Sequence, residues 1–119
     1  MKDIIIILII VLILDFLYLS NIGGKPFLEM VKKIQSQKVT VKYSSAIISY
    51  ILIILSIKYY AINQKHFIYA FLLGILIYGI FDFTNLALFN KYNLLIAIQD
   101  TLWGGVLYML TYIIYHKII

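Results

Sequence analysis

The chain has 119 residues, of which 64% are hydrophobic and 13% are charged, and its formal net charge is +5. So little polar surface excludes a soluble globular protein, and the length allows only one domain, residues 1–119. The lysines lie between apolar stretches and not in a nucleic-acid-binding motif, so we expect contact with lipid headgroups and no nucleic-acid partner. This composition predicts an all-α, multi-pass integral membrane protein, a bundle of four transmembrane helices.

The first predicted span covers residues 4–22 and begins with an almost unbroken block of Ile, Leu and Val. We interpret it as a retained helix rather than a cleaved signal peptide, because Asp15 interrupts its apolar core and no Ala-x-Ala-like cleavage site follows. Asp15 and Tyr18 share one face of this helix. The pair Gly23-Gly24, with a proline two positions later, predicts that the helix ends there.

Between the first and second spans lies the longest polar stretch of the chain, rich in lysine and glutamine. Apolar residues recur within it at three- and four-residue spacing: Phe27, Met30, Val31 and Ile34. This pattern predicts a short amphipathic helix over residues 26–38 that lies on the membrane surface. A solvated loop is the alternative.

The second predicted span covers residues 41–61 and carries a weakly polar stripe that includes Ser45 and Ser49. Small residues allow helices to approach closely in lipid, so this stripe indicates either helix packing or contact with a substrate.

The third predicted span, residues 66–89, carries the stretch that we expect to be central to the protein. Tyr78, Asp82 and Asn85 share one helical face, and Thr84 lies beside them in the sequence. An ionisable group in the middle of a membrane helix usually faces the bundle interior or a water-filled cavity and indicates a functional site.

A short turn leads to the fourth predicted span, residues 94–115, so the third and fourth spans are predicted to be antiparallel neighbours. This span has its polar residues near its beginning, at Gln99 and Asp100, with Trp103 one turn later and Tyr108 further along.

Four spans place both termini on one side of the membrane and bring Asp15, Asp82 and Asp100 to one level, about 10 Å below the opposite surface at about 1.5 Å per helical residue. Each would cost about 2.5–3.5 kcal/mol at the centre of a lipid-facing helix, so we expect all three to face inward. No lysine or arginine lies at that level, so we expect at least one aspartate to be protonated at neutral pH. A polar core that only pairs helices is the alternative.

The predicted polar site serves transport, proton relay or substrate contact, and its catalytic role, if it has one, is left open. Its members are Asp15, Tyr18, Tyr78, Asp82, Thr84, Asn85, Gln99, Asp100 and Trp103, with Ser45, Ser49 and Tyr108 as secondary members. We expect no cofactor and no metal, apart from a cation that the three aspartates would hold together.

Three motifs resemble those of a known family: Asp15-x-x-Tyr18-Leu19, Tyr78-x-x-Phe81-Asp82-x-Thr84-Asn85 and Asp100-x-x-Trp103-Gly104. The chain resembles the small four-span membrane proteins catalogued as domain of unknown function 2177. The resemblance covers nearly the whole chain and implies a four-helix integral membrane protein, but it implies no reaction.

Three functions fit these residues. The first is a small proton- or cation-coupled transporter with the aspartates as a relay; the others are an intramembrane lipid-modifying enzyme and a structural or assembly protein. The substrate, a small molecule or a lipid, is not specified. Four spans in so short a chain are also similar to small multidrug exporters, which work as dimers, so a homodimer is one expected assembly, although the first-span glutamate motif of those exporters is absent.

Lysine distribution predicts the orientation in the cell membrane. Six lysines fall on the side of the amphipathic stretch and four on the side of the termini, which favours a cytoplasmic position for the amphipathic stretch. The six are Lys25, Lys32, Lys33, Lys38, Lys42 and Lys91, and the four are Lys2, Lys58, Lys65 and Lys117.

Overall fold

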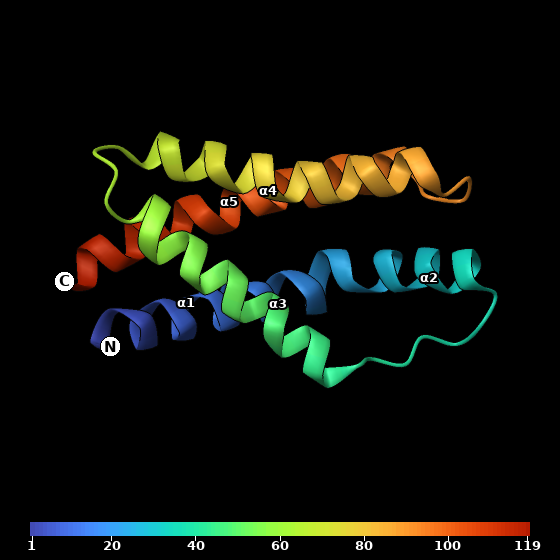
Figure 1. Ribbon diagram of the computed structural model, residues 1–119, viewed down its shortest axis with the longest axis horizontal. Helices are drawn as coiled ribbons and strands as arrows, with labels where there is room; N and C mark the ends of the chain where they lie inside the picture. Colours follow the sequence, from blue (N-terminus) through green and yellow to red (C-terminus); the bar gives the residue numbers. More distant parts are fainter.

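The computed structural model describes all 119 residues, and the chain is entirely helical (Figure 1). Its elements are α1 (Lys2–Tyr18), the π-helical turn η1 (Leu19–Gly23), α2 (Gly24–Gln35), α3 (Tyr43–Ser56), the π-helical turn η2 (Ile57–Ala61), α4 (Phe67–Leu88) and α5 (Leu94–Ile118). Four continuous helices are long and apolar enough to cross a membrane: Lys2–Gln35, Tyr43–Ala61, Phe67–Leu88 and Leu94–Ile118. The prediction of an all-α bundle with four candidate spans is therefore confirmed.

Both termini and the turn between η2 and α4 lie at one end of the bundle, and the other two connections lie toward the opposite end (Figure 1). Side-chain caps fix the starts of the last two helices. His66 Nδ1 accepts a hydrogen bond from the Ile68 amide at 3.2 Å, and Asn93 Oδ1 accepts one from the Ile96 amide at 3.1 Å. These caps satisfy amides that the first turn of a helix leaves without a partner.

The predicted end of the first helix at Gly23-Gly24 is wrong, because helical structure continues to Gln35. The two glycines instead permit a π-helical turn. The Gly24 amide donates to the Leu19 carbonyl five residues earlier, and the Tyr18 ring lies so close to Gly23 that an added Cβ would be 2.2 Å from it. Pro26 follows in the first turn of α2, where a proline is tolerated. The helix ends at Ser36, whose φ of 58° is left-handed.

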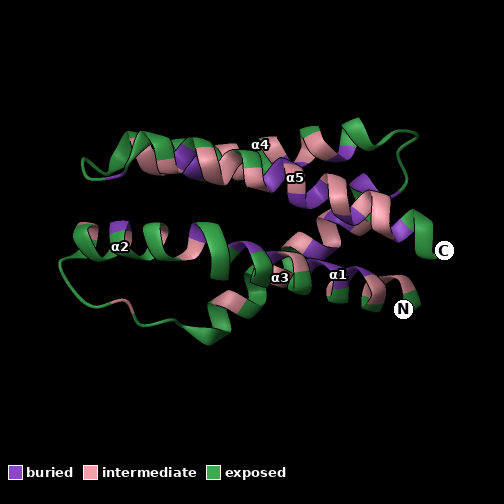
Figure 2. Cartoon of the chain, turned by 180° about the vertical axis from the view of Figure 1, so that it is seen from behind, coloured by how far each residue is buried: buried purple, intermediate pink, exposed green.

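Within the stretch predicted to be amphipathic, α2 directs its apolar face onto the turn between α4 and α5. Met30 is buried with Tyr92 and Ala97, and Phe27 and Ile34 pack around them. The helix runs along the bundle rather than across it (Figure 1), and its other face and the connection after it are largely exposed (Figure 2). Its position relative to a membrane surface stays a prediction.

The most extensive helix pair is formed by α4 and α5, which run antiparallel. The two backbones approach most closely at glycines: a Cβ added to Gly74 would lie 2.1 Å from the Gly104 carbonyl oxygen, and one added to Gly104 would meet the Tyr78 ring. Such close contact is how helices associate in lipid, where the hydrophobic effect does not drive association.

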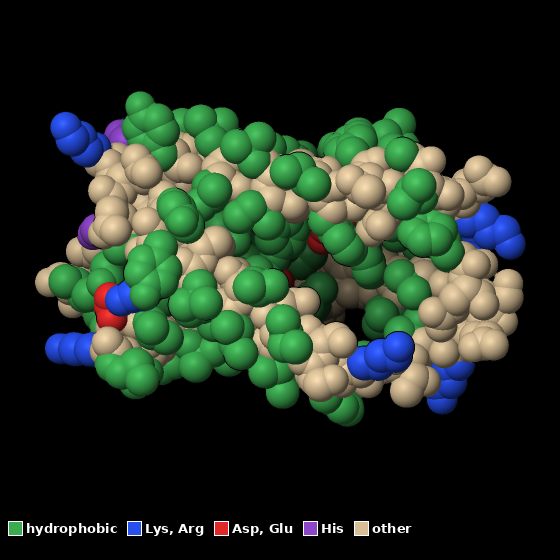
Figure 3. All heavy atoms as spheres, viewed as in Figure 1, with side chains coloured by type: hydrophobic (Ala, Val, Ile, Leu, Met, Phe, Trp, Pro, Cys, Tyr) green, Lys and Arg blue, Asp and Glu red, His purple; other side chains and the backbone are tan.

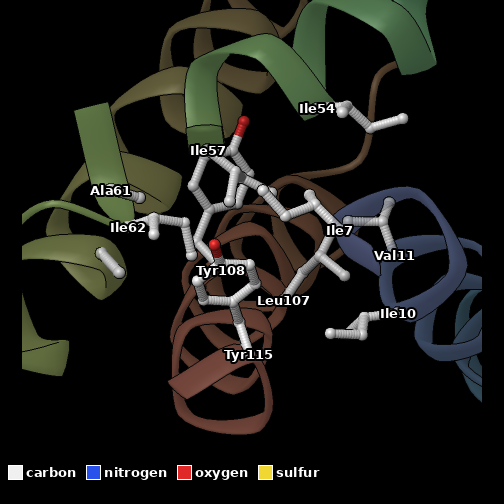
Figure 4. Close-up of a cluster of buried hydrophobic side chains, with 11 residues drawn as sticks. Ile7, Ile10, Val11, Ile54, Ile57, Ala61, Ile62, Leu107, Tyr108 and Tyr115 are labelled. Carbon is white, nitrogen blue, oxygen red and sulfur yellow. The ribbon is translucent and has the colours of Figure 1, made fainter. Parts of the chain in front are cut away.

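An apolar core lies at the end of the bundle that holds the termini (Figure 4). Ile7, Ile57, Leu107 and Tyr108 are fully buried there, and the Tyr108 hydroxyl is 2.6 Å from that of Ser56. Many large apolar side chains remain exposed on the outer faces of all four spans, as expected of helices that face lipid.

Candidate functional site

Asp82 is completely buried, and its carboxyl group accepts hydrogen bonds from two hydroxyl groups, one in the turn before α5 and one in α5. The Tyr92 hydroxyl donates to Asp82 Oδ1 at 2.7 Å, and the Thr101 hydroxyl donates to Oδ2 at 3.3 Å. Burial, and then donation to Asp82, raise the pKa of Tyr92, which lies in the turn before α5 and therefore remains a donor. Asn85, one turn after Asp82, also lies near the Tyr92 hydroxyl.

Asp100, from α5, brings a second carboxyl group against that of Asp82. The two side chains are within hydrogen-bonding reach of each other. A hydrogen bond between two carboxyl groups requires one of them to carry a proton, because an ionised carboxylate can only accept. The two carboxyl groups lie close enough to share one proton, and we refer to Asp82 and Asp100 as the carboxyl pair.

Asp15 is held separately, by donors from α3 and α5. The Tyr50 hydroxyl donates to Asp15 Oδ2, and the Trp103 indole N–H donates to Oδ1 at 2.9 Å. Trp103 in turn stacks on Tyr18, with ring centroids 4.3 Å apart and an angle of 3° between the ring planes. Because Trp103 lies one turn after Asp100, this arrangement connects Asp15 to the helix that carries Asp100.

A cavity of about 720 Å³ lies among these groups, enclosed by residues from α1, η1, α2, α3, α4 and α5. Asp15, Asp100 and Gln99 give it a polar region, and most of its wall is aromatic or aliphatic. Asp82 does not line the cavity, whereas Asp100 does. The predicted members that do line it are Asp15, Tyr18, Ser49, Tyr78, Gln99, Asp100, Trp103 and Tyr108.

The cavity has an opening on the side of the bundle between α3 and α4. Its lining includes Leu52 of α3, which is 62% exposed, and Phe81 of α4, which is 52% exposed. Figure 3 looks into this hollow from between hydrophobic side chains, and acidic side chains are visible inside it.

Comparison with known proteins gives one match that covers nearly the whole chain. The family described as Predicted membrane protein (DUF2177) matches residues 1–115. The chain belongs to this family. The resemblance seen in the three motifs is thus confirmed, as is the multi-pass membrane character of the protein. No curated protein and no solved structure matches the chain.

Two predicted members of the site are placed elsewhere in this DUF2177 protein. Thr84 is exposed and does not line the cavity. A residue two positions after Asp82 on a helix lies on nearly the opposite face. Ser45 is also exposed and lies one turn before Ser49, beyond the part of α3 that borders the cavity.

The cation that all three aspartates would hold together is not supported by the geometry. No group of three or more His, Cys, Asp or Glu side chains is arranged to hold a metal ion. The physical reason is that Asp15 is engaged by Tyr50 and Trp103, while Asp82 and Asp100 face each other.

Sequence reasoning missed Tyr50 and Tyr92, the hydroxyl donors to Asp15 and Asp82. Tyr92 lies in the polar turn between the third and fourth spans, ten positions after Asp82, where the sequence pattern indicates only a connection. A further ion pair, Lys58 Nζ to Asp3 Oδ2 at 2.6 Å, lies at the end of the bundle with the termini and outside the cavity.

Proposed function

We propose that this protein is a small proton-coupled transporter in which the carboxyl pair exchanges its proton for a cationic substrate. The observation that supports this proposal is the contact between the Asp82 and Asp100 carboxyl groups beside the cavity. Ionisable groups inside membrane helices commonly mark ion pathways and proton relays.

The chemistry follows from the different surroundings of the two carboxyl groups. Asp82 is fixed by Tyr92 and Thr101, whereas Asp100 lines the cavity. A cation that enters the cavity interacts favourably with Asp100 once the shared proton has left, and the return of the proton removes the charge that holds the cation. The proton and the cation therefore cannot bind to the carboxyl pair at the same time, which is the condition for exchange transport.

The wall of the cavity favours an amphipathic organic cation over a hydrated metal ion. Tyr18, Trp103 and Tyr78 present aromatic rings beside Asp15 and Asp100. Aromatic faces attract organic cations, and the apolar lining accommodates the hydrophobic part of such a molecule.

The side opening supports entry from the membrane itself. The large exposed side chains that line it on α3 and α4 include the apolar residues Leu52 and Phe81, at 62% and 52% exposure. An amphipathic molecule already partitioned into lipid can enter between these helices without first returning to water.

Reconstituted vesicles test this proposal. With a pH-sensitive dye enclosed, we expect tetraphenylphosphonium to drive proton movement through wild-type protein and through Asp3→Asn, which lacks a carboxylate outside the cavity. We expect Asp100→Asn to abolish the movement, because an amide cannot exchange its proton. Equal proton movement in wild type and Asp100→Asn would contradict the proposal.

A lipid-modifying enzyme is the alternative favoured by the same side opening, because a lipid reaches Asp100 by the same route. It is distinguished by lipid composition: cells that express wild type but not Asp100→Asn would contain an altered lipid species. A structural role predicts that neither lipids nor proton movement respond to Asp100→Asn and that only stability or partner retention changes.

A further inference from the structure

A second hollow lies outside the cavity, between α2 and the connection that leads to α3. Its volume is about 1090 Å³, and its walls come from the end of α1, from η1, from α2, from residues 38–41 and from Tyr50. In Figure 1 this connection leaves the far end of α2 and turns back beneath it toward α3. We call this hollow the α2 groove, and we propose that it binds one anionic phospholipid.

One end of the α2 groove is apolar and faces outward. Leu12 and Phe16 of α1, which are 44% and 69% exposed, line it on one side, and Val41 lines it on the other. Leu12 and Phe16 are one helical turn apart, so together they form a strip along the outer face of a membrane-spanning helix. An acyl chain of a bilayer lipid is the ligand that matches such a strip.

The other end of the groove is basic. Lys25 and Lys32 of α2 are two turns apart on one face, and Lys38 reaches the groove from the connection. Glu29 is the single acidic residue in the lining, so three lysines less one glutamate leave a charge of +2. A headgroup with a net negative charge is therefore favoured over a zwitterionic one.

None of these charges is neutralised within the protein. The two ion pairs of the chain both involve Asp3, at the opposite end of the bundle, and neither Glu29 nor any groove lysine takes part. Three lysines that line a groove with one glutamate and form no ion pair leave a net positive charge to be balanced by a ligand. The adjoining apolar strip distinguishes a phospholipid, which fills both ends, from a free phosphate, which fills only one.

This inference is independent of the transport proposal, because it uses no residue of the carboxyl pair. Native mass spectrometry of the intact protein, released from detergent with phosphatidylglycerol or phosphatidylcholine added, tests it directly. We expect wild type to retain one phosphatidylglycerol and no phosphatidylcholine, and glycerol 3-phosphate in excess to leave retention unchanged. Equal retention of both lipids, or displacement by glycerol 3-phosphate, would overturn the proposal.

Charge-matched variants separate a built site from general attraction to a basic surface. In Lys25→Gln/Lys32→Gln/Lys38→Gln we expect phosphatidylglycerol binding to weaken about fivefold for each lysine removed. The control Lys33→Gln/Lys42→Gln/Lys91→Gln loses the same charge from lysines that do not line the groove, and we expect its binding to match wild type. Equal weakening of phosphatidylglycerol binding in both triple variants would overturn the proposal of a specific site.

The single variants Lys32→Gln and Lys33→Gln repeat this comparison on adjacent residues if the triple variants do not fold. The apolar end has its own test. We expect Phe16→Ala to reduce retention of phosphatidylglycerol, and Phe83→Ala, an exposed phenylalanine on α4, to leave it unchanged. Retention that is unaffected by Phe16→Ala would overturn the acyl-chain part of the proposal.

Discussion

At the scale of single residues, each buried aspartate depends on donors supplied by other parts of the chain. Asp82 and Asp15 are 0% and 8% exposed, and every buried side-chain nitrogen and oxygen has a hydrogen-bond partner. A buried carboxylate without donors costs far more than one with them, so the donors Tyr50, Tyr92 and Trp103 stabilise the fold as well as orient the site.

Replacing Tyr92 tests this dependence. We expect Tyr92→Phe to lower the stability of the protein by about 1–3 kcal/mol, because Asp82 loses the donor at 2.7 Å. Tyr43→Phe, at a tyrosine that is 78% exposed, is the control. Thermal unfolding in detergent measures both, and equal midpoints for Tyr92→Phe and wild type would contradict the assignment.

The stability of Tyr92→Phe relative to wild type also has an expected dependence on pH. The pKa of Tyr92 is raised by burial and by donation to Asp82. A group with a raised pKa in the folded state contributes its full stability below its pKa in the unfolded chain, about 10 for tyrosine, and loses it as the pH rises through the folded value. The destabilisation of Tyr92→Phe relative to wild type should therefore persist from pH 5 to pH 9, and a difference that disappears within this range would contradict the raised pKa.

At the scale of helices, the closest packing lies where α4 and α5 meet at Gly74 and Gly104. We expect Gly74→Ala to destabilise the protein strongly, because the new methyl group would lie 2.1 Å from the Gly104 carbonyl oxygen and backbone cannot give way cheaply. Gly79→Ala on the same helix is a matched control, since its methyl group would lie 3.4 Å from Thr101. Similar unfolding midpoints for the two variants would contradict this close approach of the α4 and α5 backbones.

The sequence was sufficient to predict the helices because hydrophobic stretches and short polar turns are local signals. It also placed Asp82 and Asp100 correctly at one level, since a fixed rise per residue and antiparallel pairing determine depth. The break at Gly23-Gly24 was predicted wrongly because glycine permits both a helix end and a π-helical turn, and the packing of Tyr18 over Gly23 decides between them.

Side-chain partners at the site depended on contacts that no local pattern encodes. Tyr50 reaches Asp15 across 35 positions and Trp103 reaches it across 88, so these pairs follow from how α1, α3 and α5 are packed. Thr84 was included for its closeness to Asp82 in the sequence, whereas helical geometry turns it away.

At the scale of the whole molecule, the two ends of the bundle hold different segments. One end holds both termini and the turn before α4, and the other holds the end of α2 and the turn between α4 and α5. The chain contains no cysteine, so single cysteines report topology without background. We expect Ser36→Cys, at the end of α2, to react with a membrane-impermeant maleimide only after cells are permeabilised, and Gln64→Cys, at the end with the termini, to react in intact cells. The reverse pattern would contradict the cytoplasmic position proposed for α2.

The carboxyl pair is the basis of the proposed transport mechanism, and thermal stability as a function of pH tests it most directly. Raising the pH far enough to remove the shared proton leaves two adjacent carboxylates that repel each other, so we expect the unfolding midpoint of wild type to fall. Asp100→Asn keeps a permanent donor to Asp82, so we expect its midpoint to stay level over the same range. Parallel pH profiles for the two proteins would mean that Asp82 and Asp100 do not share a proton, and the transport mechanism built on them would fail.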